Sequence, residues 1–313
     1  MTTICRSFIM ILTLSLVSGM ICLNRAQSKA SLGPPPGTLI SVGGHRMHIR
    51  CVGPLDAKPT VIFEAGGGGS SKDWRAVQDL TASHIRSCAY DRAGLGWSEP
   101  GPAPRTMRQE ALELHVLLKT AKIRGPFVLV GQSVGGLLAR LYTEVYGKEV
   151  VGVVLVDSAD ENTKVYNVNV KRWVTFRELA VGRPVPAPHL NGPPSMGYKP
   201  EDDYQAEEAQ LLYLHRQANP QPLGSRPLIV LSAAKRERPP GMSDADYENL
   251  ERAREGEVRD QTTLSRNAKL MIAPEGGHNL QVDNPGFVAS AIEQEILAVA
   301  NHTKLTMQAS RAK

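Results

Sequence analysis

Apolar and polar residues along this chain follow two alternating patterns. Short runs of consecutive apolar residues, such as Phe127–Val130 and Val150–Val156, indicate strands that are buried on both faces. Between these runs, apolar residues recur every three or four positions, as at 137, 138, 141, 142 and 145, which is typical of a helix with one buried face. Strands that alternate with helices predict an α/β fold with a mostly parallel sheet.

The pattern places these elements along most of the chain. Strands are expected at residues 38–42, 45–52, 60–64, 85–90, 127–130, 150–156, 227–231 and 270–273. The first two are joined by Gly43-Gly44, which is a hairpin signal. Helices are expected around Trp74 and at residues 106–121, 137–147, 204–217 and 243–255, with a last one from Asn284.

Composition narrows the organisation of the chain. With 313 residues and 42% hydrophobic residues, the chain is long enough for one large core. Residues 158–225 are rich in proline and too long for an ordinary connection, so we expect a cap inserted between two parts of one core, residues 38–157 and 226–302. The net charge of +5 is modest and its cations are scattered, which argues against a nucleic-acid partner.

The first 28 residues have a different character. Arg6 precedes an uncharged apolar run, Phe8–Leu23, and Ala26-Gln27-Ser28 then provides a small-x-small cleavage signal. This arrangement predicts a signal peptide over residues 1–28 and a secreted or periplasmic protein. An uncleaved N-terminal anchor is the alternative, and only that alternative would give the protein a stable membrane partner.

The stretch that carries chemistry is Gly131-Gln132-Ser133-Val134-Gly135, directly after a predicted strand and directly before a predicted helix. In this context Gly-x-Ser-x-Gly indicates a nucleophile elbow, a sharp turn that exposes the serine at the end of a sheet. Glycines are needed at 131 and 135 because a Cβ there would collide with the crossing strand and helix.

Together with three other segments, this elbow makes the chain resemble the α/β-hydrolase superfamily over residues 38–300. The other segments are Glu64–Gly69 after the third strand, Tyr90–Ser98 after the fourth and Gly277-His278 after the last. The resemblance implies an eight-stranded, mostly parallel sheet flanked by helices, with an inserted helical cap. It also implies hydrolase chemistry without a cofactor or metal.

A serine hydroxyl is a poor nucleophile at neutral pH and needs a general base within hydrogen-bond reach. His278 follows the last strand, where a loop can bring its imidazole to the elbow. His45 and His48 are three residues apart on a predicted strand, so they point to opposite faces and do not suggest a metal pair.

The acid that would orient His278 is less well defined by the sequence. In the family it usually follows the strand that here ends at Leu231, but that position aligns near Arg236, with Glu237 one residue away. Asp157, which ends the preceding strand, keeps the order Ser, Asp, His and is the first choice. Glu237 is the second, and the remaining alternatives are Asp160, Asp244 and Asp246.

The resemblance also implies an oxyanion hole and roles for neighbouring residues. The backbone N–H of Val134 would be one donor, and the alignment of the glycine-rich turn selects Gly67 as the other. Asp91, Arg92 and Glu64 are expected to stiffen the loops beside the site rather than to react.

Two of the four cysteines, Cys51 and Cys88, lie outside the predicted leader. The family topology places the second strand beside the fourth, so the resemblance predicts a Cys51–Cys88 disulfide in an exported protein. Two buried thiols are the alternative.

These features together predict a serine hydrolase that cleaves carboxylic esters of small molecules through an acyl-enzyme on Ser133. An amidase or aminopeptidase, or a C–C bond hydrolase, could use the same residues. A protein that binds ligands on a hydrolase scaffold without catalysis is the alternative of a different class.

Overall fold

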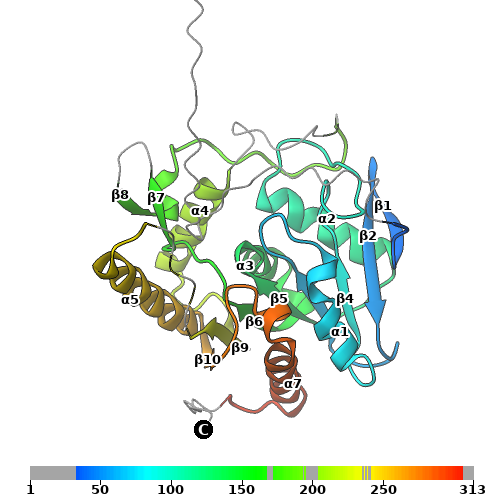
Figure 1. Ribbon diagram of the computed structural model, residues 1–313. Coiled ribbons are helices and arrows are strands. Elements are labelled where there is room, and N and C mark those ends of the chain that lie inside the picture. The colour runs from blue at the N-terminus through cyan, green and yellow to red at the C-terminus, as the bar shows by residue number, and fades with distance from the viewer. Residues whose placement is uncertain are drawn as a thin grey trace, which may run out of the picture.

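The computed structural model describes residues 33–167, 172–192, 194, 204–234, 236, 238 and 241–305. The predicted leader and Glu237 lie outside these residues. A central eight-stranded sheet has the strand order β1-β2-β4-β3-β5-β6-β9-β10 (Figure 1). Its strands are β1 (Thr38–Val42), β2 (His45–Val52), β3 (Thr60–Glu64), β4 (Ser87–Tyr90), β5 (Phe127–Gln132), β6 (Val150–Val156), β9 (Gly224–Ala233) and β10 (Ser265–Ala273).

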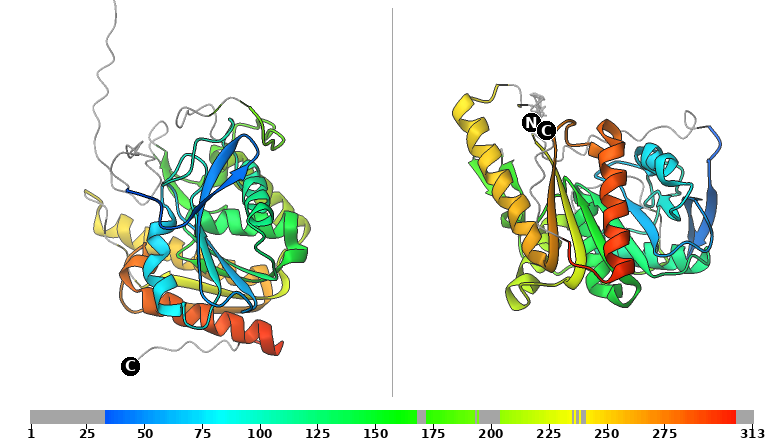
Figure 2. Two further views of the ribbon diagram at one scale, coloured as in Figure 1. Left: turned by 90° about the vertical axis from the view of Figure 1, so that its right-hand side faces the viewer. Right: turned by 90° about the horizontal axis from the view of Figure 1, so that it is seen from below.

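The sheet is mostly parallel, as the sequence predicted. β2 pairs antiparallel with β1 and with β4, and the other neighbours are parallel. β9 begins at Gly224 and β10 at Ser265, both earlier than the apolar runs alone indicated. The β1–β2 hairpin and the helix α5 lie at opposite ends of the sheet, as Figure 1 and the right view of Figure 2 show.

Helices cover both faces of the sheet. They are α1 (Arg75–Thr81), α2 (Met107–Thr120), α3 (Val134–Tyr146), α4 (Gln205–Ala218), α5 (Asp244–Gln261), α6 (Leu280–Asp283) and α7 (Pro285–Asn301). Short 3-10 helices are η2 (Ser71–Trp74), η3 (Gly147–Glu149), η4 (Phe176–Leu179) and η6 (Thr262–Leu264). The expected helix 243–255 continues to Gln261.

Alternation along β5 explains why the sheet is buried on both sides. Phe127 and Leu129 belong to the core cluster formed with α2 and α3, whereas Val128 and Val130 belong to the cluster formed with α1 and α7. Successive side chains of a strand point to opposite faces, so a continuous apolar run fills both cores. Each fully buried Val or Leu side chain contributes about 1.5–3 kcal/mol to the free energy of folding.

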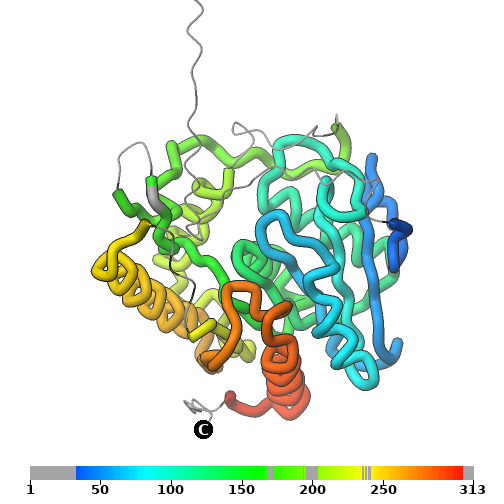
Figure 3. The backbone as a smooth tube through the Cα atoms, in the orientation of Figure 1, coloured from blue at the N-terminus to red at the C-terminus, as the bar shows by residue number. Residues whose placement is uncertain are grey.

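The chain between β6 and β9 leaves the sheet and returns to it (Figure 3). It contains the expected helix as α4, and also an antiparallel hairpin of β7 (Lys164–Asn167) and β8 (Arg172–Thr175). A helical cap was expected here and this hairpin was not, because each of its strands has only four residues and lies in a proline-rich stretch. Buried Glu161 in this segment pairs with Arg140 of α3 at 2.6 Å and with Arg216 of α4 at 3.3 Å. The pair with Arg140 attaches the inserted segment to the core, and the pair with Arg216 joins two parts of the segment itself.

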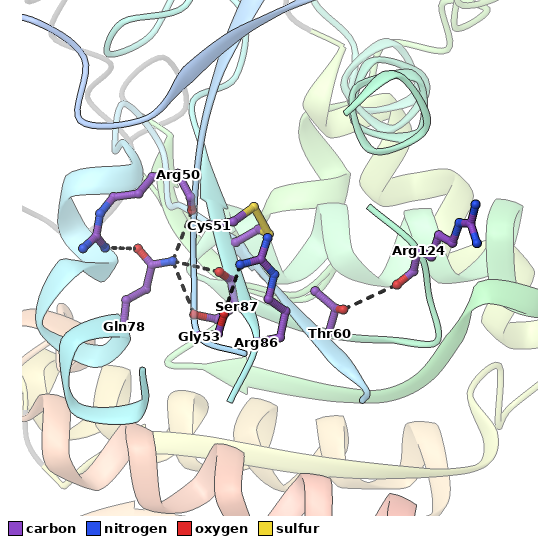
Figure 4. The surroundings of a disulfide bond; sticks show 9 residues. Arg50, Cys51, Gly53, Thr60, Gln78, Arg86, Ser87 and Arg124 are labelled. Carbon is purple, nitrogen blue, oxygen red and sulfur yellow. Dashed lines mark hydrogen bonds between the residues drawn. A yellow bond between two sulfur atoms is a disulfide. The ribbon is translucent and has the colours of Figure 1, made fainter. Parts of the chain in front are cut away.

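The predicted disulfide is present between Cys51 of β2 and Cys88 of β4, with an S–S distance of 2.05 Å (Figure 4). The two residues are direct partners in the antiparallel register. Nearby, the Gln78 side chain donates to the carbonyl oxygens of Arg50 and Ser87, each at 3.3 Å. The disulfide therefore joins two adjacent strands, and α1 is hydrogen-bonded to the same pair.

Candidate active site

The nucleophile elbow forms the junction between β5 and α3. Ser133 has φ 53° and ψ −125°, and α3 begins at the next residue, Val134. A Cβ on Gly131 would lie 2.3 Å from the carbonyl oxygen of Gly135, which confirms why this turn requires glycine. Ser133 and Val134 are partly exposed, whereas their neighbours Gln132 and Gly135 are buried. The turn therefore presents Ser133 at the edge of the sheet.

Neighbouring backbone groups hold Ser133 in this left-handed conformation. Its N–H donates to the carbonyl oxygen of Val156 at 3.2 Å, and its own carbonyl oxygen accepts from the N–H groups of Gly136 at 3.0 Å and Ala159 at 3.1 Å. A non-glycine residue at positive φ is strained, and such strain concentrates at functional sites. Here hydrogen bonds to β6 and to the start of the inserted segment hold the strained residue in place.

Asp157 directly follows β6, and His278 lies in the loop after β10; the fold brings the two side chains together. His278 Nδ1 lies 2.7 Å from Asp157 Oδ2, and the Asp157 side chain is 0% exposed while the His278 side chain is 30% exposed. Asp157 also has positive φ, 42°, and its N–H donates to the carbonyl oxygen of Leu231 at 2.8 Å. Asp157 accepts a hydrogen bond from Nδ1–H of His278, which leaves Nε2 as the free basic nitrogen.

Two arginines also surround the Asp157 carboxylate. Arg236 donates to Oδ2 from Nη2 at 2.6 Å and from Nε at 2.9 Å, and Arg254 Nη1 lies 3.6 Å from Oδ1. Burial alone would raise the pKa of Asp157. The hydrogen bond from His278 and the charges of Arg236, His278 and Arg254 outweigh burial and hold this pKa below its ordinary value. Asp157 is therefore a carboxylate at neutral pH.

The other acidic residues that the sequence suggested lie elsewhere. Asp160 accepts from the N–H of Asn162 at 2.6 Å, Asp244 pairs with Arg238, and Asp246 bonds the Ser243 hydroxyl. Glu237 is outside the described residues. Of the acids considered, Asp157 is the one that the structure places beside His278.

Gln132 connects the elbow to the loop that carries His278. Its Nε2 donates to the carbonyl oxygen of His278 at 3.0 Å. A Cβ on Gly66 would lie 2.2 Å from Gln132 Oε1 and 3.3 Å from Ser133 Cβ, so the glycine-rich turn also packs against this side chain. Gln132 thus connects the elbow to both the glycine-rich turn and the loop of His278.

The glycine-rich turn after β3 lies beside Ser133. Gly69 N–H donates to the carbonyl oxygen of Gly66 at 3.1 Å, and Gly67, between them, is exposed. The buried Arg92 donates to the carbonyl oxygens of Ala65 at 2.6 Å and Gly66 at 2.7 Å. Since both carbonyls are held by Arg92, the orientation of the turn's peptide groups is fixed.

Arg92 is itself held by a buried acidic group. Its Nη1 donates to Glu64 Oε1 at 2.5 Å, and the Tyr90 hydroxyl donates to the other Glu64 oxygen. Burial raises the pKa of Glu64 to about 7, although the charge of Arg92 and the hydrogen bond from Tyr90 act in the opposite direction. These contacts agree with the stiffening role that the sequence predicted for Glu64 and Arg92.

Other kinds of site are not found within the described part of the chain. It contains no group of three or more His, Cys, Asp or Glu side chains arranged to hold a metal ion. Among its helices, none is both long enough and apolar enough to cross a membrane. A surface hollow lies at the opposite edge of the sheet, where Leu118, Lys122 and Phe127 line it, and its lining does not include Ser133, Asp157 or His278.

Known proteins resemble this chain at the level of the fold. The sequence profile of the "Alpha/beta hydrolase family" matches residues 61–291. The chain therefore belongs to the α/β hydrolase family, and the resemblance drawn from the motifs is confirmed. The structure of a thermophilic esterase from Thermogutta terrifontis is similar with a TM-score of 0.52 and 17% identity, and the match covers 84% of this chain and 98% of that one. At this identity the likeness concerns the fold.

Two curated relatives add little about function. The probable transporter efuK of Hormonema carpetanum is 36% identical over 131 residues, which cover 40% of this chain and only 19% of that protein. The uncharacterized protein YqjL of Bacillus subtilis is 27% identical over 233 residues, which cover 74% of this chain and 81% of that protein.

Sequence reasoning missed three side chains at this site. Gln132 occupies the first variable position of the Gly-x-Ser-x-Gly motif, and that position could have drawn attention to it. Arg236 stands in the sequence where an acid was expected, and nothing in that position indicated its contact with Asp157. Arg254 lies on the buried face of α5 and had no signal in the sequence, because its contact with Asp157 depends on how α5 packs against β9.

Proposed function

We propose that this protein is a serine hydrolase that cleaves carboxylic esters of small molecules through an acyl-enzyme on Ser133. The observation that carries the proposal is the pairing of His278 with buried Asp157 at 2.7 Å, at the same edge of the sheet as the strained, partly exposed Ser133. A serine at an elbow and an oriented, partly exposed imidazole are the groups that acyl transfer requires.

In the proposed reaction, Ser133 Oγ attacks the ester carbonyl carbon while its proton passes to His278 Nε2. The negative charge on the carbonyl oxygen would be stabilised by the N–H groups of Val134 and Gly67. Collapse of this intermediate breaks the carbon–oxygen bond of the ester, and the alcohol leaves with the proton from His278. Water then attacks the acyl group in the same way and restores Ser133. Asp157 holds His278 in the required tautomer and stabilises the imidazolium.

We further propose that the protein works outside the cytosol. The disulfide between Cys51 and Cys88 supports an oxidising compartment, and the leader predicted over residues 1–28 supports export. N-terminal sequencing of the protein from its native host should find a start near residue 29. Recovery of the intact N-terminus would instead favour an uncleaved anchor.

The main test uses a fluorophosphonate probe, which reacts covalently with activated serines. We expect labelling of the wild type and none of Ser133→Ala, with loss of ester hydrolysis by a factor on the order of 10⁴ or more. Ser71→Ala is the matched control, because Ser71 also lies near a histidine and an aspartate, His48 and Asp91, but is buried. It should be labelled like the wild type.

The substrate class is tested with the same protein. Rates on p-nitrophenyl esters of increasing acyl length are compared with rates on the matching anilides. We expect esters to be cleaved faster. Labelling of Ser133 with anilides cleaved at least as fast would point to an amidase, and absence of labelling in a folded wild type would point to a non-catalytic binding protein.

A further inference from the structure

One oxygen atom of Asp157 is shared between His278 and an arginine. Oδ2 accepts from His278 Nδ1 at 2.7 Å and from Arg236 Nη2 at 2.6 Å and Nε at 2.9 Å. Because His278 Nδ1 lies 2.7 Å and Arg236 Nη2 lies 2.6 Å from the same oxygen, the imidazole and the guanidinium are close neighbours. A positive charge on His278 would therefore form close to the permanent positive charge of Arg236.

The remaining groups around Asp157 do not cancel the charge of Arg236. Oδ1 contacts the N–H of Ala233 at 3.3 Å and the Ser232 hydroxyl at 3.4 Å, and Arg254 is also paired with Glu251 at 2.8 Å. Glu257 is the other acid that acts on Arg236. Its pKa is raised to about 8, first by burial and then by Asp160, so it is mostly protonated at neutral pH.

Hydrogen bonds at its backbone carbonyl and at its guanidinium fix the position of Arg236. Its carbonyl oxygen accepts from the hydroxyl of Tyr247 on α5 at 2.7 Å, and its side chain is only 20% exposed. The guanidinium can donate two hydrogen bonds to one carboxylate in a rigid geometry, which a lysine cannot. Arg236 therefore restrains the carboxylate that orients His278.

We propose that Arg236 is a positioning residue that fixes Asp157 toward His278 and extends catalysis to lower pH. The inference rests on the function proposed for Ser133, His278 and Asp157. When His278 accepts a proton, the Asp157 carboxylate must stabilise two cations through one oxygen, so each is stabilised less. Asp157 therefore stabilises a positive charge on His278 less than it would if Arg236 were absent.

The test is the pH profile of kcat/KM for Arg236→Gln, measured with a p-nitrophenyl ester between pH 4 and 9. We expect the acid limb of the profile to move up by about one pH unit, because removal of a neighbouring charge favours the imidazolium. Arg236→Lys keeps the charge and should keep the acid limb close to that of the wild type, while kcat falls because the carboxylate is less restrained.

Arg238→Gln is the matched control. Arg238 lies in the same loop, is 43% exposed and pairs with Asp244 instead of Asp157, so its removal should leave the profile unchanged. If Arg236→Gln does not fold, Arg236→Met keeps the length of the side chain without its charge and should give the same shift.

The outcomes separate this inference from the proposed function. Fluorophosphonate labelling of Ser133 in the wild type and in Arg236→Gln at pH 8, together with an unshifted acid limb, would overturn the inference and leave the serine hydrolase intact. A shift of equal size in Arg238→Gln would also overturn it, since the effect would then be one of net charge. Absence of labelling in the wild type would overturn the proposed function itself.

Discussion

Among the residues that the structure describes, two His–Asp pairs have similar geometry and different surroundings. His278 and Asp157 are 2.7 Å apart, and the imidazole is 30% exposed. His48 and Asp91 are 3.0 Å apart, and both side chains are 0% exposed. Each pair also lies near a serine, Ser133 in one case and Ser71 in the other.

The pair of His48 and Asp91 holds the loops of Ser71 and Trp97 together. Ser71 N–H donates to Asp91 Oδ1 at 2.7 Å, Trp97 N–H donates to Oδ2 at 2.9 Å, and the hydroxyl of Ser71 lies 3.4 Å from the same His48 nitrogen that faces Asp91. The other nitrogen of His48 is buried without a hydrogen-bond partner. A His–Asp pair supports catalysis only where the second imidazole nitrogen can reach both a serine and a substrate, and the buried pair offers neither.

The strongest way to separate the two pairs is to remove each histidine. His278→Ala should lower kcat/KM by a factor on the order of 10⁴ or more and change the melting temperature little, because the partly exposed ring contributes little packing. His48→Ala should do the opposite. It leaves Asp91 buried without its partner, at a cost of about 3–5 kcal/mol in the free energy of unfolding, with the folded fraction still active. Thermal melts and active-site titration of both variants check this contrast.

The contrast between the pairs would be lost if His48→Ala abolished activity in the folded protein. That result would place the buried pair in the catalytic machinery.

A smaller effect is expected from the disulfide, which joins β2, the strand of His48, to β4, the strand that leads to Asp91. The bridge closes a loop with a sequence separation of 37. Replacing both cysteines by alanine should lower the free energy of unfolding by about 2–4 kcal/mol, because the unfolded chain gains freedom. Urea denaturation measures this loss, and kcat at 25 °C should stay within about twofold because neither strand carries a proposed catalytic group.

A drop in kcat that follows reduction of the disulfide, without any loss of fold by circular dichroism, would contradict this separation of framework and site.

The smallest effect concerns stability in acid. Burial acts to raise the pKa of Asp91, but the hydrogen bonds from His48 and from the backbone of Ser71 and Trp97 prevail and lower it. A carboxyl with a folded pKa below its unfolded value of about 3.9 stabilises the protein above that pH, and this contribution is lost as the pH falls through the folded pKa. Asp91→Asn should therefore lose about 1–3 kcal/mol at pH 7 and show a flatter decline of stability below pH 4.

Urea denaturation at pH 3, 4, 5 and 7 measures this change. Asp79→Asn is the control, because Asp79 is 53% exposed and pairs with the half-buried Arg50 and the exposed Arg75. Its loss should be within about 0.5 kcal/mol and independent of pH. Equal behaviour of the two variants would show that the hydrogen bonds to Asp91 are not the cause.

Much of the fold could be predicted because local pattern and tertiary structure agree. The apolar run of β6 and the glycines of the elbow have one physical explanation each: burial on both faces and close approach of a strand and a helix. The hairpin of β7 and β8 could not be predicted, because strands of four residues are too short to show a clear alternating pattern. The start of β9 at Gly224 was also missed, because its first residues are partly exposed at the end of the sheet.

The sequence by itself determined the elbow turn at Ser133, the place of His278 after the last strand and the succession of strands along the chain, since each depends on residues that are neighbours in sequence. Only the tertiary structure decided which carboxylate faces His278. Asp157 and His278 are 121 positions apart, and Arg236 and Arg254 reach the same carboxylate from other segments. A local pattern has no information about contacts at such separations. The packing of β6, β9 and α5 sets them, and with them the charge around the proposed base.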